Sequence, residues 1–108
     1  MPHLVRMTES AREDSLEIGQ YVAENDSPSR ARYVVEGIEE RVASLAEFPE
    51  RGALVGKFLD MGISGFREVR FQPYRIIYQV SDNEVQILLI ADGRRNMHSL
   101  LIRRLLQG

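Results

Sequence analysis

Residues Phe66–Arg95 read FREVRFQPYRIIYQVSDNEVQILLIADGRR. Apolar and β-branched residues concentrate in Tyr74–Val80 and in Val85–Ala91, and the turn formers Gln72-Pro73 and Ser81-Asp82-Asn83 separate the apolar runs. This pattern predicts an antiparallel meander of short strands that ends in a basic turn, Asp92-Gly93-Arg94-Arg95.

Alternation along these strands predicts the two faces of the sheet. One face is expected to lie under helices and to hold Val69, Phe71, Ile76, Tyr78, Val80, Val85, Ile87, Leu89 and Ala91. The other face is half apolar and holds Glu68, Arg70, Arg75, Ile77, Gln79, Leu88, Ile90 and Asp92. A final helix at Asn96–Leu106 is expected to cover part of it.

The sequence before the meander predicts a strand followed by a helical hairpin. The strand is expected at His3–Thr8, Thr8 or Ser10 can cap the first helix, and Glu24-Asn25-Asp26 ends it. Ser27-Pro28 opens the second helix and Pro49 stops it. The expected buried residues are Ala11, Ser15, Ile18, Tyr21 and Val22 in the first helix, and Ala31, Val34 or Val35, Ile38, Val42, Leu45 and Phe48 in the second. The four glycines and the absence of periodicity in residues 51–65 predict an irregular connection.

Length and composition indicate one small soluble domain, residues 1–108. Cysteine is absent, no stretch resembles a signal peptide or a membrane span, and a cytoplasmic protein is expected. The net charge of −2 conceals an asymmetry. Residues 1–50 hold 5 Arg against 11 Asp and Glu, giving −6, whereas residues 51–108 hold 9 Arg and Lys against 5 Asp and Glu, giving +4.

Few residue patterns indicate catalysis. Histidine is the residue type best suited to proton transfer near neutral pH, and the chain has two, His3 and His98. Their separation predicts surface or packing roles and no metal site. The glycines of residues 51–65 lack phosphate-loop spacing, so no nucleotide or other cofactor is expected. Tyr74 and Tyr78 beside Arg70 and Arg75 can in principle stabilise a phosphoryl transition state. The favoured alternative is that Tyr78 is core and that both arginines pair with Glu68, Glu84 or Asp92.

The Asp92-Gly93-Arg94-Arg95 turn allows two interpretations. In a structural one, Asp92 caps the following helix or clamps Arg94. In the second interpretation the turn takes part in recognition, with one arginine facing inward and the other outward.

The order of these elements resembles the ParE toxins of the RelE/ParE superfamily of type II toxin–antitoxin systems. The matching residues are Ala11-x-x-Asp14-x-x-x-Ile18-x-x-Tyr21-Val22, then Ala31, Ile38, Leu45, Pro49, Arg51-Gly52, Phe66-Arg67, Tyr74-Arg75-Ile76-Ile77-Tyr78 and Asp92-Gly93-Arg94-Arg95-Asn96-Met97. The resemblance implies an α+β fold: an N-terminal strand, a helical hairpin, an antiparallel sheet of three or four strands and a C-terminal helix.

The resemblance also implies a function and partners. ParE-like toxins poison DNA gyrase by leaving cleaved-DNA complexes, whereas RelE-like relatives cut mRNA on the ribosome. A ParD-like antitoxin is the expected partner, in a heterotetramer, and operator DNA is expected to be contacted only through that antitoxin. The negative net charge, and a tail after Leu100 without Tyr, His or Lys, favour the gyrase branch. Asp92 stands where many family members carry histidine, which also disfavours a nuclease.

These expectations define three sets of candidate residues. Those for target binding are Asp92, Arg94, Arg95, Arg103 and Arg104; those for antitoxin binding are Tyr33, Val34, Leu54, Phe58, Arg67, Arg70 and Arg75. No catalytic residue is expected in a gyrase poison, and a nuclease would use Arg70, Tyr74, Arg75 and Tyr78. A third hypothesis is a non-toxic co-repressor that retains only antitoxin binding.

Overall fold

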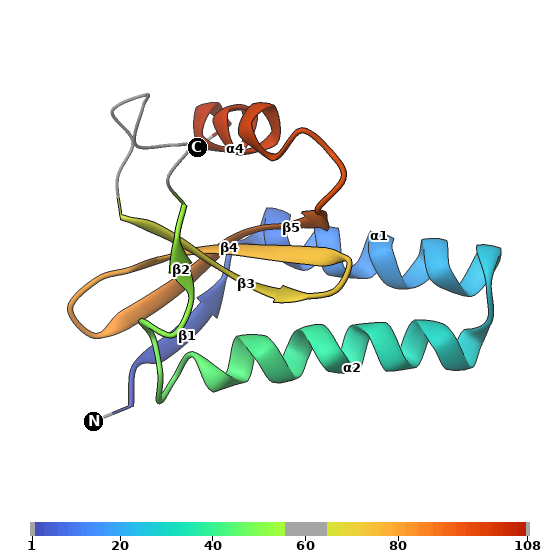
Figure 1. Cartoon of the computed structure of the whole chain (residues 1–108), viewed down its shortest axis with the longest axis horizontal. Helices are drawn as coiled ribbons and strands as arrows, with labels where there is room; N and C mark the ends of the chain where they lie inside the picture. The colour runs from blue at the N-terminus through green and yellow to red at the C-terminus, as the bar shows by residue number, and fades with distance from the viewer. Residues whose placement is uncertain (1, 56–64, 108) are drawn as a thin grey trace.

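The structure is a computed structural model that describes residues 2–55 and 65–107. Its elements are β1 (Leu4–Met7), α1 (Glu9–Asn25), α2 (Pro28–Ser44), β2 (Ala53–Leu54), β3 (Phe66–Phe71), β4 (Tyr74–Val80), β5 (Glu84–Asp92) and α4 (Met97–Leu106). The α1–α2 hairpin packs on one face of the sheet and α4 on the other (Figure 1). The predicted fold class is confirmed. Neither the length nor the hydropathy of any described helix suits a membrane span.

The sheet has five strands in the order β1-β5-β4-β3-β2. The three long strands form the predicted meander. The sheet is wider than expected because β1 joins it parallel to β5, and because Ala53–Leu54, within the predicted irregular connection, pairs with β3. Strand β1 is therefore an edge strand in a mixed sheet.

Local sequence signals explain where the hairpin helices begin. The Thr8 side chain accepts a hydrogen bond from the Ala11 backbone N–H, so Thr8 caps α1. Ser27 caps α2 through the Arg30 N–H, and Pro28 occupies the first turn.

The prediction that α2 runs to Phe48 was wrong. The helix ends at Ser44, whose hydroxyl donates to the Arg41 carbonyl oxygen at 2.7 Å, a side-chain bond that competes with the helical ladder. The chain turns there, and Phe48 lies exposed instead of buried. Tyr21 of α1, also predicted to be buried, is 66% exposed. It lies at the border of the α1 stripe, where helical spacing alone does not separate buried from exposed positions.

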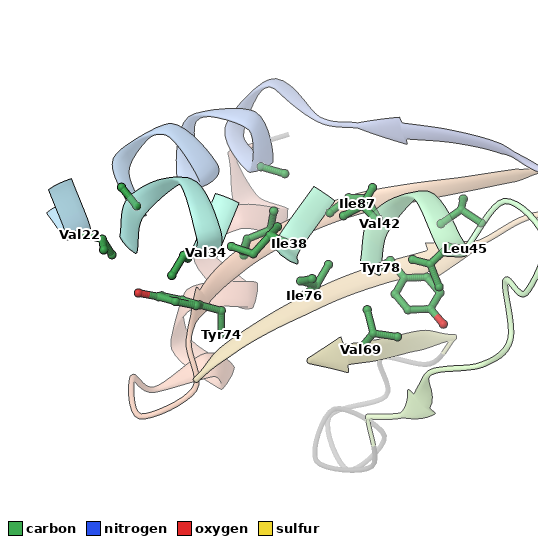
Figure 2. Packing of buried hydrophobic residues seen from close by; sticks show 14 residues of the cluster. Val22, Val34, Ile38, Val42, Leu45, Val69, Tyr74, Ile76, Tyr78 and Ile87 are labelled. Carbon is green, nitrogen blue, oxygen red and sulfur yellow. The ribbon is translucent and has the colours of Figure 1, made fainter. Parts of the chain in front are cut away.

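The hydrophobic core has two parts, one on each face of the sheet. The hairpin-side cluster includes Ile38, Leu45, Ile76 and Tyr78 (Figure 2), and the cluster under α4 includes Leu101. Leu89 and Ala91 belong to the α4 cluster and Ile90 to the hairpin cluster, opposite to the predicted faces. The cause is a β-bulge: Tyr78 pairs with Ile87 and Ile77 with Leu89, so Leu88 is the extra residue that reverses the alternation.

A close approach at Gly52 fixes the loop before β2. The Gly52 N–H donates to the Tyr78 hydroxyl at 3.0 Å, and a Cβ added to Gly52 would lie 2.5 Å from both that oxygen and the Glu68 carbonyl oxygen. We expect Gly52→Ala to lower the free energy of unfolding by about 2 kcal/mol, because a backbone oxygen cannot move aside cheaply. Urea unfolding measures the change. The exposed neighbour Ala53→Ser is the control, and an unchanged midpoint for Gly52→Ala would contradict this packing.

Candidate functional site

The sheet separates the residues that a nuclease would need. The Tyr74 and Tyr78 rings are buried in the hairpin-side cluster. Arg75 alternates with Tyr74 and Ile76, so it projects from the other face. There Arg75 Nε donates to Glu68 Oε2, and Arg70 Nη2 pairs with Glu68 Oε1 at 3.2 Å. The preferred interpretation, core tyrosine and paired arginines, is confirmed for these contacts.

The two tyrosines are also poorly suited to proton transfer at neutral pH. Burial raises the pKa of Tyr74, and the neighbouring Asp92 carboxylate raises it further. Burial likewise raises the pKa of Tyr78, against a smaller lowering effect of its hydrogen bond with the Gly52 N–H. Both phenols therefore remain protonated near pH 7, and neither is poised as a general base.

The basic turn after β5 is held by Asp92. Its carboxylate accepts hydrogen bonds from the Arg94 backbone N–H at 2.9 Å and from the Arg94 guanidinium at 3.0 and 2.6 Å. Asn96, not Asp92, caps α4 through the Ser99 N–H. Of the two structural roles considered for Asp92, the clamp on Arg94 is therefore the one present. Arg95 is exposed beside it and makes no ion pair within the described residues.

The clamp lowers the pKa of Asp92, chiefly through the hydrogen bond from the Arg94 side chain. We expect Arg94→Ala to raise this pKa part of the way towards its usual value of 3.8, because the backbone N–H bond remains. The lowered pKa means that Asp92 stabilises the fold above its unfolded pKa and that this contribution is lost as pH falls through the folded value. An NMR titration of the carboxyl carbon measures the shift. Arg103→Ala should leave the titration unchanged, and an unaltered Asp92 pKa in Arg94→Ala would contradict the clamp.

Arg104 is a structural residue and not a free cation. Its guanidinium donates to both oxygens of Asp14 at 2.8 and 2.9 Å and to the Leu88 carbonyl oxygen at 2.8 Å. Asp14 also accepts the Ile90 N–H at 3.0 Å. This Asp14–Arg104 latch ties α1 and α4 to the β5 bulge.

Of the five candidates for target binding, Arg95 and Arg103 are therefore exposed without an ion pair among the described residues. Both line a polar groove of about 420 Å³ between α1, β5 and α4. The groove thus holds two guanidinium groups that form no ion pair among the described residues.

The described candidates for antitoxin binding differ in their exposure and pairing. Tyr33 and Leu54 are exposed on α2 and β2, whereas Val34 is buried in the hairpin-side cluster and only 4% exposed. Arg67 Nη1 donates to the Gly52 and Glu50 carbonyl oxygens at 2.8 and 3.3 Å. Arg70 and Arg75 are paired with Glu68, as described above. Phe58 lies outside the described residues.

The sequence patterns did not indicate one further groove. It has a volume of about 940 Å³ and lies between α1, α2 and β1. Its apolar lining includes Val5, Met7, Leu16, Val35 and Val42, and Arg6, Arg12, Arg32 and Glu39 add charge. Leu16 is 69% exposed and falls outside the buried α1 stripe, so an unassigned apolar residue on a helix was the available signal.

Comparison with known proteins identifies the family. The sequence matches the family model for the ParE toxin of type II toxin–antitoxin systems, parDE, over residues 5–97. This chain belongs to the ParE toxin family. It is therefore the toxin of a type II toxin–antitoxin system. No curated protein matches the sequence.

Solved structures of similar fold come from both branches of the superfamily. A chain of the chromosomal ParDE system from P. aeruginosa has a TM-score of 0.70 and 24% identity, covering 83% of this toxin and 95% of that chain. A chain of the RelBE2 toxin–antitoxin complex from Mycobacterium tuberculosis has a TM-score of 0.62 and 25% identity, covering 85% and 99%. E. coli RelE, as a double mutant in the free state, has a TM-score of 0.66 and 18% identity, covering 96% and 98%.

Proposed function

We propose that this toxin inhibits DNA gyrase by binding it and stabilising its cleaved-DNA complex, without catalysing a reaction itself. The separation of the nuclease candidates is the observation that supports this most. Tyr74 and Tyr78 are buried on one side of the sheet, and Arg70 and Arg75 are paired with Glu68 on the other. A nuclease would need these groups to converge on one scissile phosphate.

Arg95 and Arg103 are the proposed contacts to the target. They are exposed, unpaired within the described residues, and line one polar groove. Guanidinium groups bind carboxylate or phosphate oxygens in a bidentate manner, so either gyrase or its DNA provides suitable acceptors. Asp92 and Asp14 hold the neighbouring Arg94 and Arg104 and so build the frame around them.

A gyrase assay with purified toxin tests this proposal. Toxin added to gyrase, ATP and relaxed plasmid should inhibit supercoiling and leave linear DNA after protein digestion. The double variant Arg95→Ala/Arg103→Ala should need about tenfold more toxin for the same inhibition, as expected when two charge-assisted bonds of about 0.7 kcal/mol each are lost at an exposed site. Arg12→Ala, on the far side of α1, is the matched control. Full supercoiling at saturating wild-type toxin would refute the proposal.

The competing function is cleavage of mRNA on the ribosome. Under that hypothesis, programmed ribosomes treated with toxin should yield cut mRNA, and Arg75→Ala should abolish the cuts. The co-repressor hypothesis instead predicts harmless expression of the toxin without an antitoxin.

We further propose that the α1–α2–β1 groove receives the antitoxin. Its apolar lining fits one face of an amphipathic helix, and three arginines against one glutamate favour an acidic segment. A ParD-like antitoxin in a heterotetramer is the proposed partner, and its own DNA-binding part would contact the operator. In this proposal the antitoxin contacts the side of the hairpin that carries Leu16, and it does not contact Val34.

Leu16→Asp tests the antitoxin groove. A carboxylate in the apolar lining of a groove that prefers an acidic partner should weaken the complex at least about tenfold, measured by calorimetry with the cognate antitoxin. Leu106→Asp is the matched control, because Leu106 is exposed on α4 and is not among the residues that line this groove. Equal affinities for Leu16→Asp and wild type would exclude this groove as the antitoxin site.

A further inference from the structure

Arginine and aromatic side chains of α2 and β3 lie in contact with one another. The α1–α2 loop and the β3–β4 turn lie towards the same end of the molecule (Figure 1). The Arg30 guanidinium lies 4.8 Å from the Tyr33 ring centre. The Tyr33 and Phe71 rings are 5.4 Å apart at an angle of 55°, and the Arg41 guanidinium lies 5.5 Å from the Phe71 ring centre. Four side chains from α2 and β3 thus form one continuous row of contacts.

Further aromatic and arginine residues extend this row towards the basic turn after β5. Tyr21 and Tyr74 line a small hollow together with Arg30, and the same two tyrosines line a second hollow together with Arg94 and Arg95. Figure 2 shows Tyr74 near Val34, with its hydroxyl at the outer end of the labelled cluster. We call this row the arginine–aromatic belt and define it as Tyr21, Arg30, Tyr33, Arg41, Phe71 and Arg95.

Two members of the belt, Phe71 and Arg41, are held in place by contacts with the rest of the protein. Gly37 has no Cβ, and an added one would overlap the Phe71 ring, so this ring lies directly on α2. Arg41 Nε donates to the Arg70 carbonyl oxygen at 3.2 Å, which fixes its guanidinium over Phe71. Preorganised aromatic rings bind at a low entropic cost.

The belt is also accessible and cationic. Tyr33 is 54% exposed, and Tyr21 is among the exposed aromatic residues. Within residues 2–55 and 65–107, Arg30, Arg41 and Arg95 form no ion pair with a carboxylate. Carboxylates border both hollows, Asp26 the first and Asp14, Glu17 and Asp92 the second. Charge alone is therefore weak here, and the rings must contribute.

From this juxtaposition we infer that the belt binds single-stranded DNA, with bases stacked on Tyr21 and Tyr33 and phosphates held by Arg30, Arg41 and Arg95. Base stacking on aromatic side chains combined with nearby arginines is how proteins hold a single strand without reading its sequence. A duplex keeps its bases stacked on each other and cannot offer them to the tyrosine rings. The choice of DNA over RNA rests on the proposed function, inhibition of gyrase at cleaved DNA. The inference that the belt binds a single strand does not depend on that proposed function.

Fluorescence anisotropy of the full-length toxin with labelled oligothymidine of about 15 nucleotides tests the inference, and it needs no gyrase. We expect saturable binding that weakens about 20-fold between about 50 and 200 mM salt, the change for about three phosphate contacts. Tyr33→Ala should weaken binding about fivefold or more, while Tyr33→Phe, which keeps the ring, should bind like wild type. Leu106→Ala, an exposed position on α4 outside the belt, is the control, and circular dichroism verifies that each variant is folded.

Distinct outcomes would overturn the inference. These are an absence of saturable binding at low salt, equal binding by Tyr33→Ala and wild type, or a preference for a duplex of equal length. Stronger binding to oligouridine than to oligothymidine would overturn the choice of DNA. Binding of polyglutamate without oligonucleotide binding would show that the belt is a protein-binding surface. The anisotropy assay contains no gyrase, so its outcome does not depend on the outcome of the supercoiling assay. A failure of the single-strand inference can therefore be told apart from a failure of the proposed function.

Discussion

Replacing Leu101 with alanine is expected to lower the free energy of unfolding by about 3 kcal/mol, the largest effect of any substitution considered for this toxin. Leu101 has no exposed surface and is packed with Ile77, Leu88 and Leu89 between α4 and the sheet. Truncation removes buried methyl groups and leaves a cavity in the smaller of the two core clusters. Urea unfolding followed by circular dichroism gives the change.

Leu106→Ala provides a matched control on the same helix. Leu106 is 83% exposed, so the same chemical change should alter the stability by less than about 0.5 kcal/mol. Similar losses for the two variants would mean that α4 does not pack on the sheet as described. α4 also carries Arg103, which lines the same groove as Arg95, the other arginine proposed to contact the target.

Asp14→Ala is expected to cost about 2 to 3 kcal/mol. It leaves the Arg104 guanidinium without its carboxylate and the Ile90 N–H without its acceptor, both in a partly buried place. The side chains of Asp14 and Arg104 are 14% and 19% exposed, so water compensates for only part of the loss. The same unfolding assay measures it.

A double-mutant cycle identifies the latch specifically. Glu17→Ala, one turn along α1 and exposed, should change the stability by less than about 0.5 kcal/mol. Asp14→Ala combined with Arg104→Ala should cost clearly less than the sum of the single variants, because each single variant already breaks the pair. Additive losses would show that the two side chains do not interact in solution.

Most of the architecture followed from sequence patterns, since the apolar runs between Phe66 and Ala91 and the caps at Thr8 and Ser27 act locally. The faces of β5 could not be predicted beyond Ile87. The bulge at Leu88 involves the register with the partner strand β4, and the Leu88 carbonyl oxygen accepts a hydrogen bond from the Arg104 guanidinium. The alternation of apolar residues along β5 indicates neither contact. The parallel pairing of β1 with β5 is likewise a contact between distant segments.

The candidate site was predictable only in part. The sequence left Glu68, Glu84 and Asp92 as possible partners of Arg70 and Arg75. Glu68 is the partner because it lies two residues from Arg70, which is directly across the hairpin from Arg75, so the three side chains share a face. The Asp14–Arg104 pair joins residues 90 positions apart, so no local pattern could identify either partner. The α1–α2–β1 groove depends on how two helices and an edge strand meet, which composition does not specify.

The same toxin preparation, added in parallel to gyrase with plasmid DNA and to programmed ribosomes with mRNA, tests the central claim most directly. Buried tyrosines and paired arginines on opposite faces of the sheet predict linear plasmid after protein digestion and intact mRNA. Intact plasmid together with cut mRNA, with the cuts lost in Arg75→Ala, would contradict the claim and assign the toxin to the ribosome.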